Sequence, residues 1–195
     1  MRRCAGASAR SLRLRPRKPL TINPDNDRRP RMGMAIFWGG LACGVLDIAY
    51  AFAFYGARGI SPIRLLQGIA RGLIGPAALR GGTATALLGL LLHFTVAFGA
   101  AVTYCLASQK FTWMIRRAFL SGLLFGIAVY FFMNFVVIPL SAIHRWPVIG
   151  RLFVVNLIEH MLIVGLPIAV AARKFMGGAD AAISSSPRLR ASQSA

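Results

Sequence analysis

The chain has 195 residues, of which 56% are hydrophobic and only 14% charged, and its mean hydropathy of +0.62 is too high for a soluble domain that must keep its surface hydrated. Its net charge of +18 would suit a nucleic-acid-binding protein, but the basic residues lie in the tails and between apolar segments, where membrane orientation and anionic lipid headgroups explain them better. We therefore predict an integral membrane protein whose main partner is the lipid bilayer, and we do not expect it to bind nucleic acid.

Residues 1–31 contain ten Arg or Lys and four Pro, with no acidic residue before Asp25. Such a composition cannot build a core, so we predict a disordered basic tail. Three origins fit it: a tail that docks on anionic lipid, an organellar transit peptide, or a start codon placed upstream of the true one at Met32 or Met34. The tail has no apolar core, which excludes a secretory signal.

The first apolar segment covers residues 33–57, which is long enough to cross the roughly 30 Å hydrocarbon layer as a helix. Gly40, Gly44 and Asp47 follow one another at steps of four and three, so they share one helix face. The two glycines suit this face to close packing against another helix. Asp47 lies almost at the centre of the span, where a carboxylate needs a partner.

Residues 61–71 predict a short amphipathic helix. Ser61 is a good N-cap and Pro62 suits the first helical position. The basic and polar side chains fall on one side of this helix: Arg64, Gln67 and Arg71. We predict that it lies along the membrane surface, and a plain connector is the alternative.

The second span, residues 83–107, carries His93 near its middle, with Gly89 one turn earlier on the same side. A basic and aromatic link, residues 109–117, then has the composition of a turn at headgroup level. The third span, residues 118–140, places small and then polar residues at steps of four: Gly122, Gly126, Tyr130 and Asn134. Another helix can approach the glycine end of this face closely.

The fourth span, residues 152–172, contains Asn156, Glu159 and His160 within an otherwise apolar run. A carboxylate beside an imidazole at that depth persists only if something compensates for its cost in hydrocarbon. Pro167 predicts a local kink, which neighbouring helices can tolerate.

The membrane domain is placed at residues 32–175, and the small, serine-rich residues 176–195 predict a second disordered tail. If both termini are cytoplasmic, seventeen basic residues lie inside and six outside, so we predict that orientation. Short links make consecutive spans antiparallel neighbours. The predicted fold is all-α, an up-down four-helix bundle with a short interfacial helix between the first and second spans.

The polar side chains of the four spans fall in one slab of the membrane. Asp47 and His93 lie within two residues of their span centres, and the others lie up to about five residues, or ~7.5 Å, outward. If the faces marked by Gly40, Gly44, Gly89, Gly122 and Gly126 turn inward, one buried cluster forms. Its members are Asp47, His93, Tyr130, Asn134, Asn156, Glu159 and His160.

Two interpretations of this cluster stay open. In one, the side chains satisfy one another and hold the helices in register, through contacts worth about 0.6 kcal/mol each. In the other, the carboxylates and imidazoles mark a proton or ion pathway, because ionisable groups at the midplane are costly and tend to be functional. Glu159 and His160 are about 100° apart on a helix, so we expect one to face the bundle and the other its seam.

Asp or Glu together with His suits proton transfer, and the same side chains are ligands for zinc, iron or manganese. The sequence has no HExxH or ExxH motif and no acid-rich repeat, so we predict no cofactor and keep a divalent metal as an alternative. The three cysteines have no paired spacing. Ser108, Ser121 and Ser141 lie at span ends outside any GxSxG motif, which disfavours an enzyme.

Several stretches carry a resemblance to a known group of proteins: GGLACGVLDIAY at 39–50, HFTVAFGA at 93–100, YFFMNFVVIPLS at 130–141, and EHM at 159–161 with GLP at 165–167. Over roughly residues 34–174 the chain resembles small uncharacterised four-span proteins of the bacterial inner membrane. The His of the second span, the Pro-Leu end of the third and the His of the fourth are also similar to the YagU-type inner-membrane family. The resemblance implies a four-span fold and a bacterial inner-membrane location, and it implies no biochemical activity.

From these patterns we predict a small transporter, or an ion- or proton-coupled membrane protein, that uses the carboxylates and imidazoles of the cluster. The alternative is a non-catalytic scaffold or accessory subunit whose glycine faces pack against another membrane protein. Four helices leave little room for a substrate path, so we expect a transporter of this size to form a homodimer or a larger membrane complex.

Overall fold

The computed structural model describes residues 24–177 of the chain, with side chains from Arg31 onward. Within this part every regular element is a helix. Four helices are long and apolar enough to cross a membrane: Arg31–Gly56, Gly82–Lys110, Ala118–Leu140 and Arg151–Met176. The prediction of an all-α chain with four long apolar helices is confirmed, and the helix ends lie within a few residues of the predicted ones.

Shorter elements divide and connect the long helices. In chain order the elements are α1 (Pro24–Gly56), α2 (Pro62–Ile74), the 3-10 helix η1 (Gly75–Arg80), α3 (Gly82–Lys110), α4 (Trp113–Arg116), α5 (Ala118–Phe132), η2 (Met133–Val137), α6 (Ile138–Leu140), α7 (Arg151–Glu159), η3 (His160–Gly165) and α8 (Leu166–Met176). Both η2 and η3 are π-helical turns within longer helices. Such turns are rare and concentrate at functional sites.

The first helix begins inside the segment that we predicted to be a disordered tail. α1 starts at Pro24, so residues 24–31 are helical. Proline suits a first helical position, because the N–H that it lacks would have no intrahelical partner there. The other parts of the two predicted tails, residues 1–23 and 178–195, lie outside the described residues.

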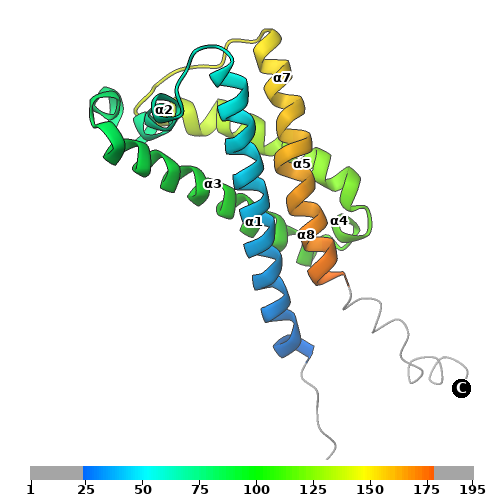
Figure 1. The fold of residues 1–195 in the computed structure, drawn as a ribbon. Coiled ribbons are helices and arrows are strands. Elements are labelled where there is room, and N and C mark those ends of the chain that lie inside the picture. Colours follow the sequence, from blue (N-terminus) through cyan, green and yellow to red (C-terminus); the bar gives the residue numbers. More distant parts are fainter. Residues whose placement is uncertain (1–23, 178–195) are drawn as a thin grey trace, which may run out of the picture.

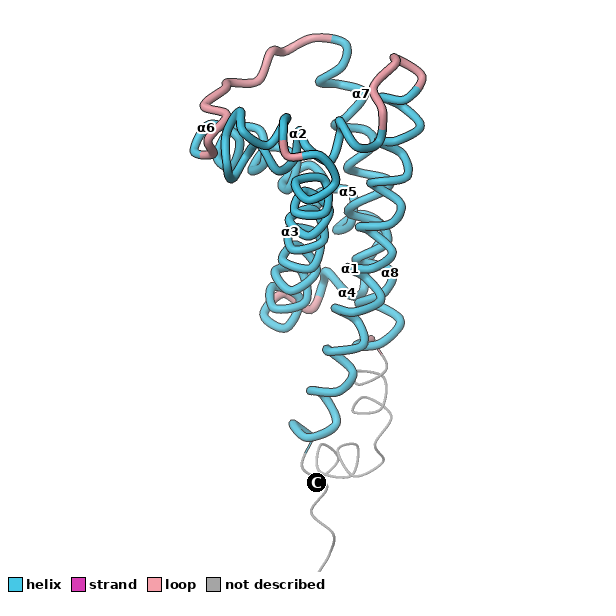
Figure 2. The backbone as a smooth tube through the Cα atoms, turned by 60° about the vertical axis from the view of Figure 1, so that its left-hand side comes forward, coloured by secondary structure: helices cyan, strands magenta, loops and turns pink. Residues whose placement is uncertain are grey.

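α1 lies between α3 and α8 and packs along both. The fourth long helix, which runs through α7, η3 and α8, lies between α1 and α5 (Figure 1). α1 begins and α8 ends at the same end of the molecule, and the chain segments after α1 and α6 lie at the opposite end (Figures 1 and 2). The first and last long helices are therefore neighbours in space.

α3 and α5 follow each other in sequence but do not pack along their whole lengths. At one end the Tyr104 hydroxyl lies 2.7 Å from the Ser121 hydroxyl. Toward the other end α2 bridges them. Gly89 of α3 faces the main chain of α2, and the Ala142 N–H, just after α6, donates to the Gly72 carbonyl of α2 at 2.9 Å. α2 thus connects the start of α3 with the chain segment that follows α6.

α2 itself begins as its sequence predicts. The Ser61 hydroxyl accepts a hydrogen bond from the Arg64 N–H, and Pro62 is the first helical residue. The buried Gln67 donates to the Gly82 carbonyl at 3.0 Å. α2 is therefore fixed to the start of α3 by a polar contact as well as by packing.

The glycine face of α1 receives aromatic rings from α3. A Cβ atom added to Gly40 would lie 2.5 Å from the Phe98 ring, and one added to Gly44 would lie 2.7 Å from the Phe94 ring. Contacts this short do not occur between real Cβ atoms and their neighbours, so a larger side chain would separate the helices. Gly40 and Gly44 thus set the distance between α1 and α3.

A second glycine contact joins α5 to η3. A Cβ atom on Gly165 would lie 2.8 Å from the Gly126 amide nitrogen, and one on Gly122 would lie 3.0 Å from the Gly165 carbonyl oxygen. Gly126 in turn faces the main chain of His160. Small residues let helix backbones come this close, and the contact holds η3 at a fixed height beside α5.

Candidate functional site

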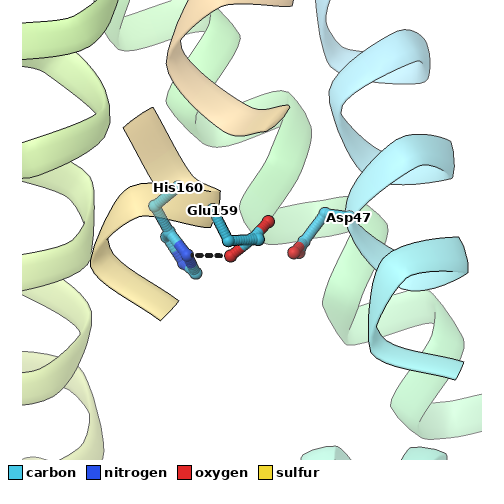
Figure 3. Close-up of side chains that lie close together, drawn as sticks. All are labelled: Asp47, Glu159 and His160. Atoms are coloured by element: carbon cyan, nitrogen blue, oxygen red, sulfur yellow. Dashed lines mark hydrogen bonds and ion pairs between the residues drawn. The ribbon is translucent and has the colours of Figure 1, made fainter. Parts of the chain in front are cut away.

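Three ionisable side chains from two long helices meet inside the molecule (Figure 3). Asp47 comes from α1, Glu159 from the end of α7 and His160 from the start of η3. One carboxylate or ring atom from each lies within 4.8 Å of the other two. Glu159 is the deepest, with 4% of its side chain exposed, compared with 25% for Asp47.

His160 orients Glu159. Its Nδ1 contacts the Glu159 Oε2 and lies 3.0 Å from the Asn156 carbonyl oxygen. A carbonyl can only accept, so Nδ1 carries a hydrogen and donates it. The Tyr130 ring packs against the imidazole with ring centroids 5.0 Å apart, which limits its rotation. The second oxygen of Glu159, Oε1, is buried and has no hydrogen-bond partner among the described residues.

His93 of α3 extends this group from the other side of Asp47. Its Nε2 lies 2.8 Å from the Gly44 carbonyl oxygen, so this nitrogen is the donor. The other ring nitrogen, Nδ1, is then free to accept, and it lies 3.8 Å from the Asp47 Oδ2. The four side chains form a continuous series, His93, Asp47, Glu159 and His160, which we call the polar row.

The polar row can hold and move protons. Its two carboxylates lie next to each other in an apolar interior, where two like charges repel strongly, so the pair is most stable when a proton neutralises one of them. Each imidazole has its N–H directed to a carbonyl oxygen, so the movable proton belongs to the carboxylates in the centre.

The spacing of Asp47, Glu159 and His160 also allows one ion to touch all three. The ring nitrogen of His160 that meets Glu159 is a donor, however, and a donor nitrogen has no lone pair for a metal. Binding a metal through it would break the hydrogen bond to the Asn156 carbonyl. The arrangement therefore suits a proton better than a divalent metal.

Of the other predicted cluster residues, Tyr130 and Asn156 adjoin the polar row and Asn134 does not. Asn156 also donates from Nδ2 to the Tyr55 hydroxyl at 3.4 Å, and the Tyr130 hydroxyl donates to the Phe153 carbonyl at 2.9 Å. The Asn134 amide instead bonds at 2.9 Å to the Tyr130 carbonyl of its own helix. Asn134 lies in the π-turn η2, where the altered backbone pattern makes such a local bond available.

A cavity of about 570 Å³ opens beside the polar row, and Asp47, His93 and His160 line it. Its other walls come from α2, η2 and the facing parts of α1, α3 and η3, and most of their side chains are aliphatic: Ile48, Leu65, Ile69, Leu92, Val96, Val129, Met133 and Val164. A largely apolar cavity of several hundred Å³ with a few convergent polar groups has the form of a small-molecule site.

The sequence did not reveal two contributors to this cavity. Tyr55 lines it, and its hydroxyl accepts a hydrogen bond from the Asn156 amide. α2 forms one wall through Leu65, Gly68 and Ile69. The apolar side of its amphipathic pattern was the available signal, since that side must cover something.

Comparison of the chain with family models, with curated proteins and with solved structures finds no match. The polar row and the cavity beside it are the features of the molecule that indicate a function.

Proposed function

We propose that this chain is a multi-pass membrane protein in which the four long helices span the bilayer and α2 lies at the surface opposite the termini. Four apolar helices of sufficient length support this. The basic residues at the end of α3, in α4 and at the end of α8, Lys110, Arg116, Arg173 and Lys174, favour a cytoplasmic location for that end. The resemblance to four-span proteins favours the bacterial inner membrane.

This topology gives a direct prediction. Reporter domains fused before α1 or after α8 should be cytoplasmic, and one inserted in the exposed turn at Arg58–Gly59 should be external, because the long helices cross four times. Fusions scored with a pair of reporters, one active only inside and one only outside, measure this. A cytoplasmic signal at Arg58–Gly59 would refute the proposed crossing of α1.

We further propose that the protein is ion- or proton-coupled, with the polar row as the coupling site. The observation that carries this proposal is the pair of adjacent carboxylates placed between two imidazoles at the wall of a cavity. Intramembrane ionisable groups are costly and mark proton or ion pathways. The cavity supplies the space for a substrate whose binding the proton would control.

In this mechanism the carboxylate pair alternates between two protonation states. With the pair fully protonated, the row is neutral and stable in an apolar surrounding. Loss of one proton leaves a negative charge on the carboxylate pair beside the cavity, and the His160 Nδ1–H stabilises this charge by donating to Glu159. The small-transporter function predicted from the sequence would use this change of charge to bind and release its substrate.

Infrared spectroscopy of the full chain in lipid tests the proton-holding step. As the pH is lowered, the wild type should gain the carbonyl band of a protonated carboxyl group shielded from water, because Glu159 is buried. Asp47→Asn and Glu159→Gln should each shift or remove this band. Asp180→Asn, which removes the same kind of group outside the described residues, should leave it unchanged.

A band that is the same in the wild type and in both row variants would refute proton sharing at this site.

The scaffold alternative gains no support from the glycine faces, because each of the five predicted packing glycines meets a partner within its own chain. Gly40 and Gly44 face Phe98 and Phe94, and Gly89 faces α2. Gly122 and Gly126 face the fourth long helix.

A further inference from the structure

We propose that the cavity binds a lipophilic monovalent organic cation, which exchanges for a proton of the Asp47 and Glu159 pair. This inference rests on the proposed function and names its substrate class. It follows from the walls of the cavity, from the charges that face it and from the need to keep a buried site neutral.

The side chains that line the cavity favour an apolar ligand. The cavity has a volume of about 570 Å³, which falls within the range of sites for small organic ligands. Leu65, Ile69 and Leu73 of α2 form one side, and Val129 and Met133 form another. A ligand that filled this space would replace water with aliphatic contacts, each buried CH₂ group contributing about 0.8 kcal/mol.

The charged side chains at the cavity favour a positively charged ligand. Asp47 lines the cavity, Glu159 lies next to it, and among residues 31–177 no Arg or Lys lines the cavity. Several titratable groups surround Asp47. Its own helix contributes Cys43 and Tyr55, α3 contributes His93, and the fourth long helix contributes Glu159 and His160. Tyr130 of α5 contacts His160, and α2 contributes no titratable group to the lining of the cavity. One ring nitrogen of each imidazole lies against a carbonyl oxygen, and Asp47 is the acidic side chain that lines the cavity.

Charge balance then fixes the exchange. In the empty site the carboxyl pair holds the proton that will be exchanged. When one monovalent cation enters, one proton leaves from Asp47 or Glu159, so the net charge of the site does not change. No covalent bond changes and no oxidant or reductant is needed. A buried site avoids net charge because desolvation of an unpaired charge is costly.

Tetraphenylphosphonium and tetraphenylborate test the proposal, because they have the same shape and opposite charges. The full chain in lipid nanodiscs should bind tetraphenylphosphonium above the level of empty nanodiscs and should not bind tetraphenylborate. Titration in weakly buffered solution should release one proton per cation. Competition by one proton should raise the apparent Kd about tenfold per pH unit toward acid.

Two variants locate the binding. Gly68→Trp should abolish it, because Gly68 lines the cavity and a Cβ there meets no atom within 4 Å, so the indole fills the cavity without forcing α2 away. Gly99→Trp is the control, since Gly99 is an exposed residue of α3 outside the cavity whose Cβ also meets nothing within 4 Å. Asp47→Asn should remove both the binding and the proton release.

Equal binding of the two ions, or tetraphenylphosphonium binding that survives Gly68→Trp and Asp47→Asn, would overturn the inference. Absence of tetraphenylphosphonium binding would also overturn it. In each case the infrared band decides separately on the proposed function. If the band depends on Asp47, proton coupling stands with a different substrate, and if it does not, both proposals fail.

Discussion

Replacing Asp47 by Asn should leave the protein folded and abundant and should abolish its activity in the cell. The Asn amide keeps a similar shape and can still hydrogen-bond to His93 and Glu159, while the cost of burying a charge disappears. Asn cannot titrate, so the polar row would lose its exchangeable proton. The stability of the folded chain should therefore stay within about 1 kcal/mol of the wild type.

Two measurements on each variant separate these effects. Thermal unfolding in detergent reports stability, and complementation of cells that lack the gene reports activity. Glu159→Gln and His93→Gln should behave like Asp47→Asn, because each interrupts the same row. Asn134→Ala is the matched control, since it removes an intramembrane polar side chain that bonds only within its own helix. It should complement.

Complementation by all three row variants would show that the row serves only to hold the helices together. If every row variant instead fails to accumulate as folded protein, the charges themselves stabilise the structure. The chemistry of the site would then have to be judged from the infrared and binding measurements.

Replacing Gly165 by Ala should lower stability strongly, although alanine is the better helix former. The added Cβ would lie 2.8 Å from the Gly126 amide nitrogen and 2.9 Å from the Gly122 carbonyl carbon. Both are main-chain atoms that cannot rotate away. Overpacking typically costs about 1–3 kcal/mol, which corresponds to a fall in Tm of roughly 2–12 °C for a chain of this size.

Gly99→Ala is the control, and its expected change in Tm is zero or positive where that of Gly165→Ala is negative. Gly99 also lies inside a long helix, but its Cβ would meet nothing within 4 Å, so only the helix propensity changes and the Tm should stay the same or rise. Thermal unfolding in one detergent compares the two variants. Equal shifts in Tm for Gly165→Ala and Gly99→Ala would mean that α5 and η3 have room for a methyl group between them, which would contradict the close contact described above.

The positions of the long helices could be read from the sequence because a span needs an unbroken apolar run, and such runs need no knowledge of their neighbours. How the helices pair could not be read in the same way. Consecutive α3 and α5 are held apart in part by α2, and the Gly89 contact with α2 depends on a helix that the sequence suggested only as a surface element. Short links favour packing between consecutive helices, but a short helix that contacts both of them can change this arrangement.

The core of the site was predictable because ionisable side chains are rare in apolar runs, and their burial is costly unless they contact one another. Asp47, His93, Glu159 and His160 do meet. We expected adjacent Glu159 and His160 to face different directions, but the His160 side chain turns along its own helix to reach Glu159. Asn134 was expected in the cluster, and its side-chain amide bonds to the Tyr130 carbonyl one turn earlier in its own helix, a local bond that a short polar side chain can make in any helix.

The contact between α1 and α8 implies an order of assembly. Chains are made from the N-terminus, so α1 is synthesised long before α8, with which it packs, exists. α3 follows and brings His93 to Asp47, which gives the carboxylate an early companion in lipid. Glu159 arrives only with the fourth long helix. Packing of that helix beside α1 is then the step that joins the two carboxylates and completes the wall of the cavity, so the proposed proton exchange would have to wait until synthesis is nearly finished.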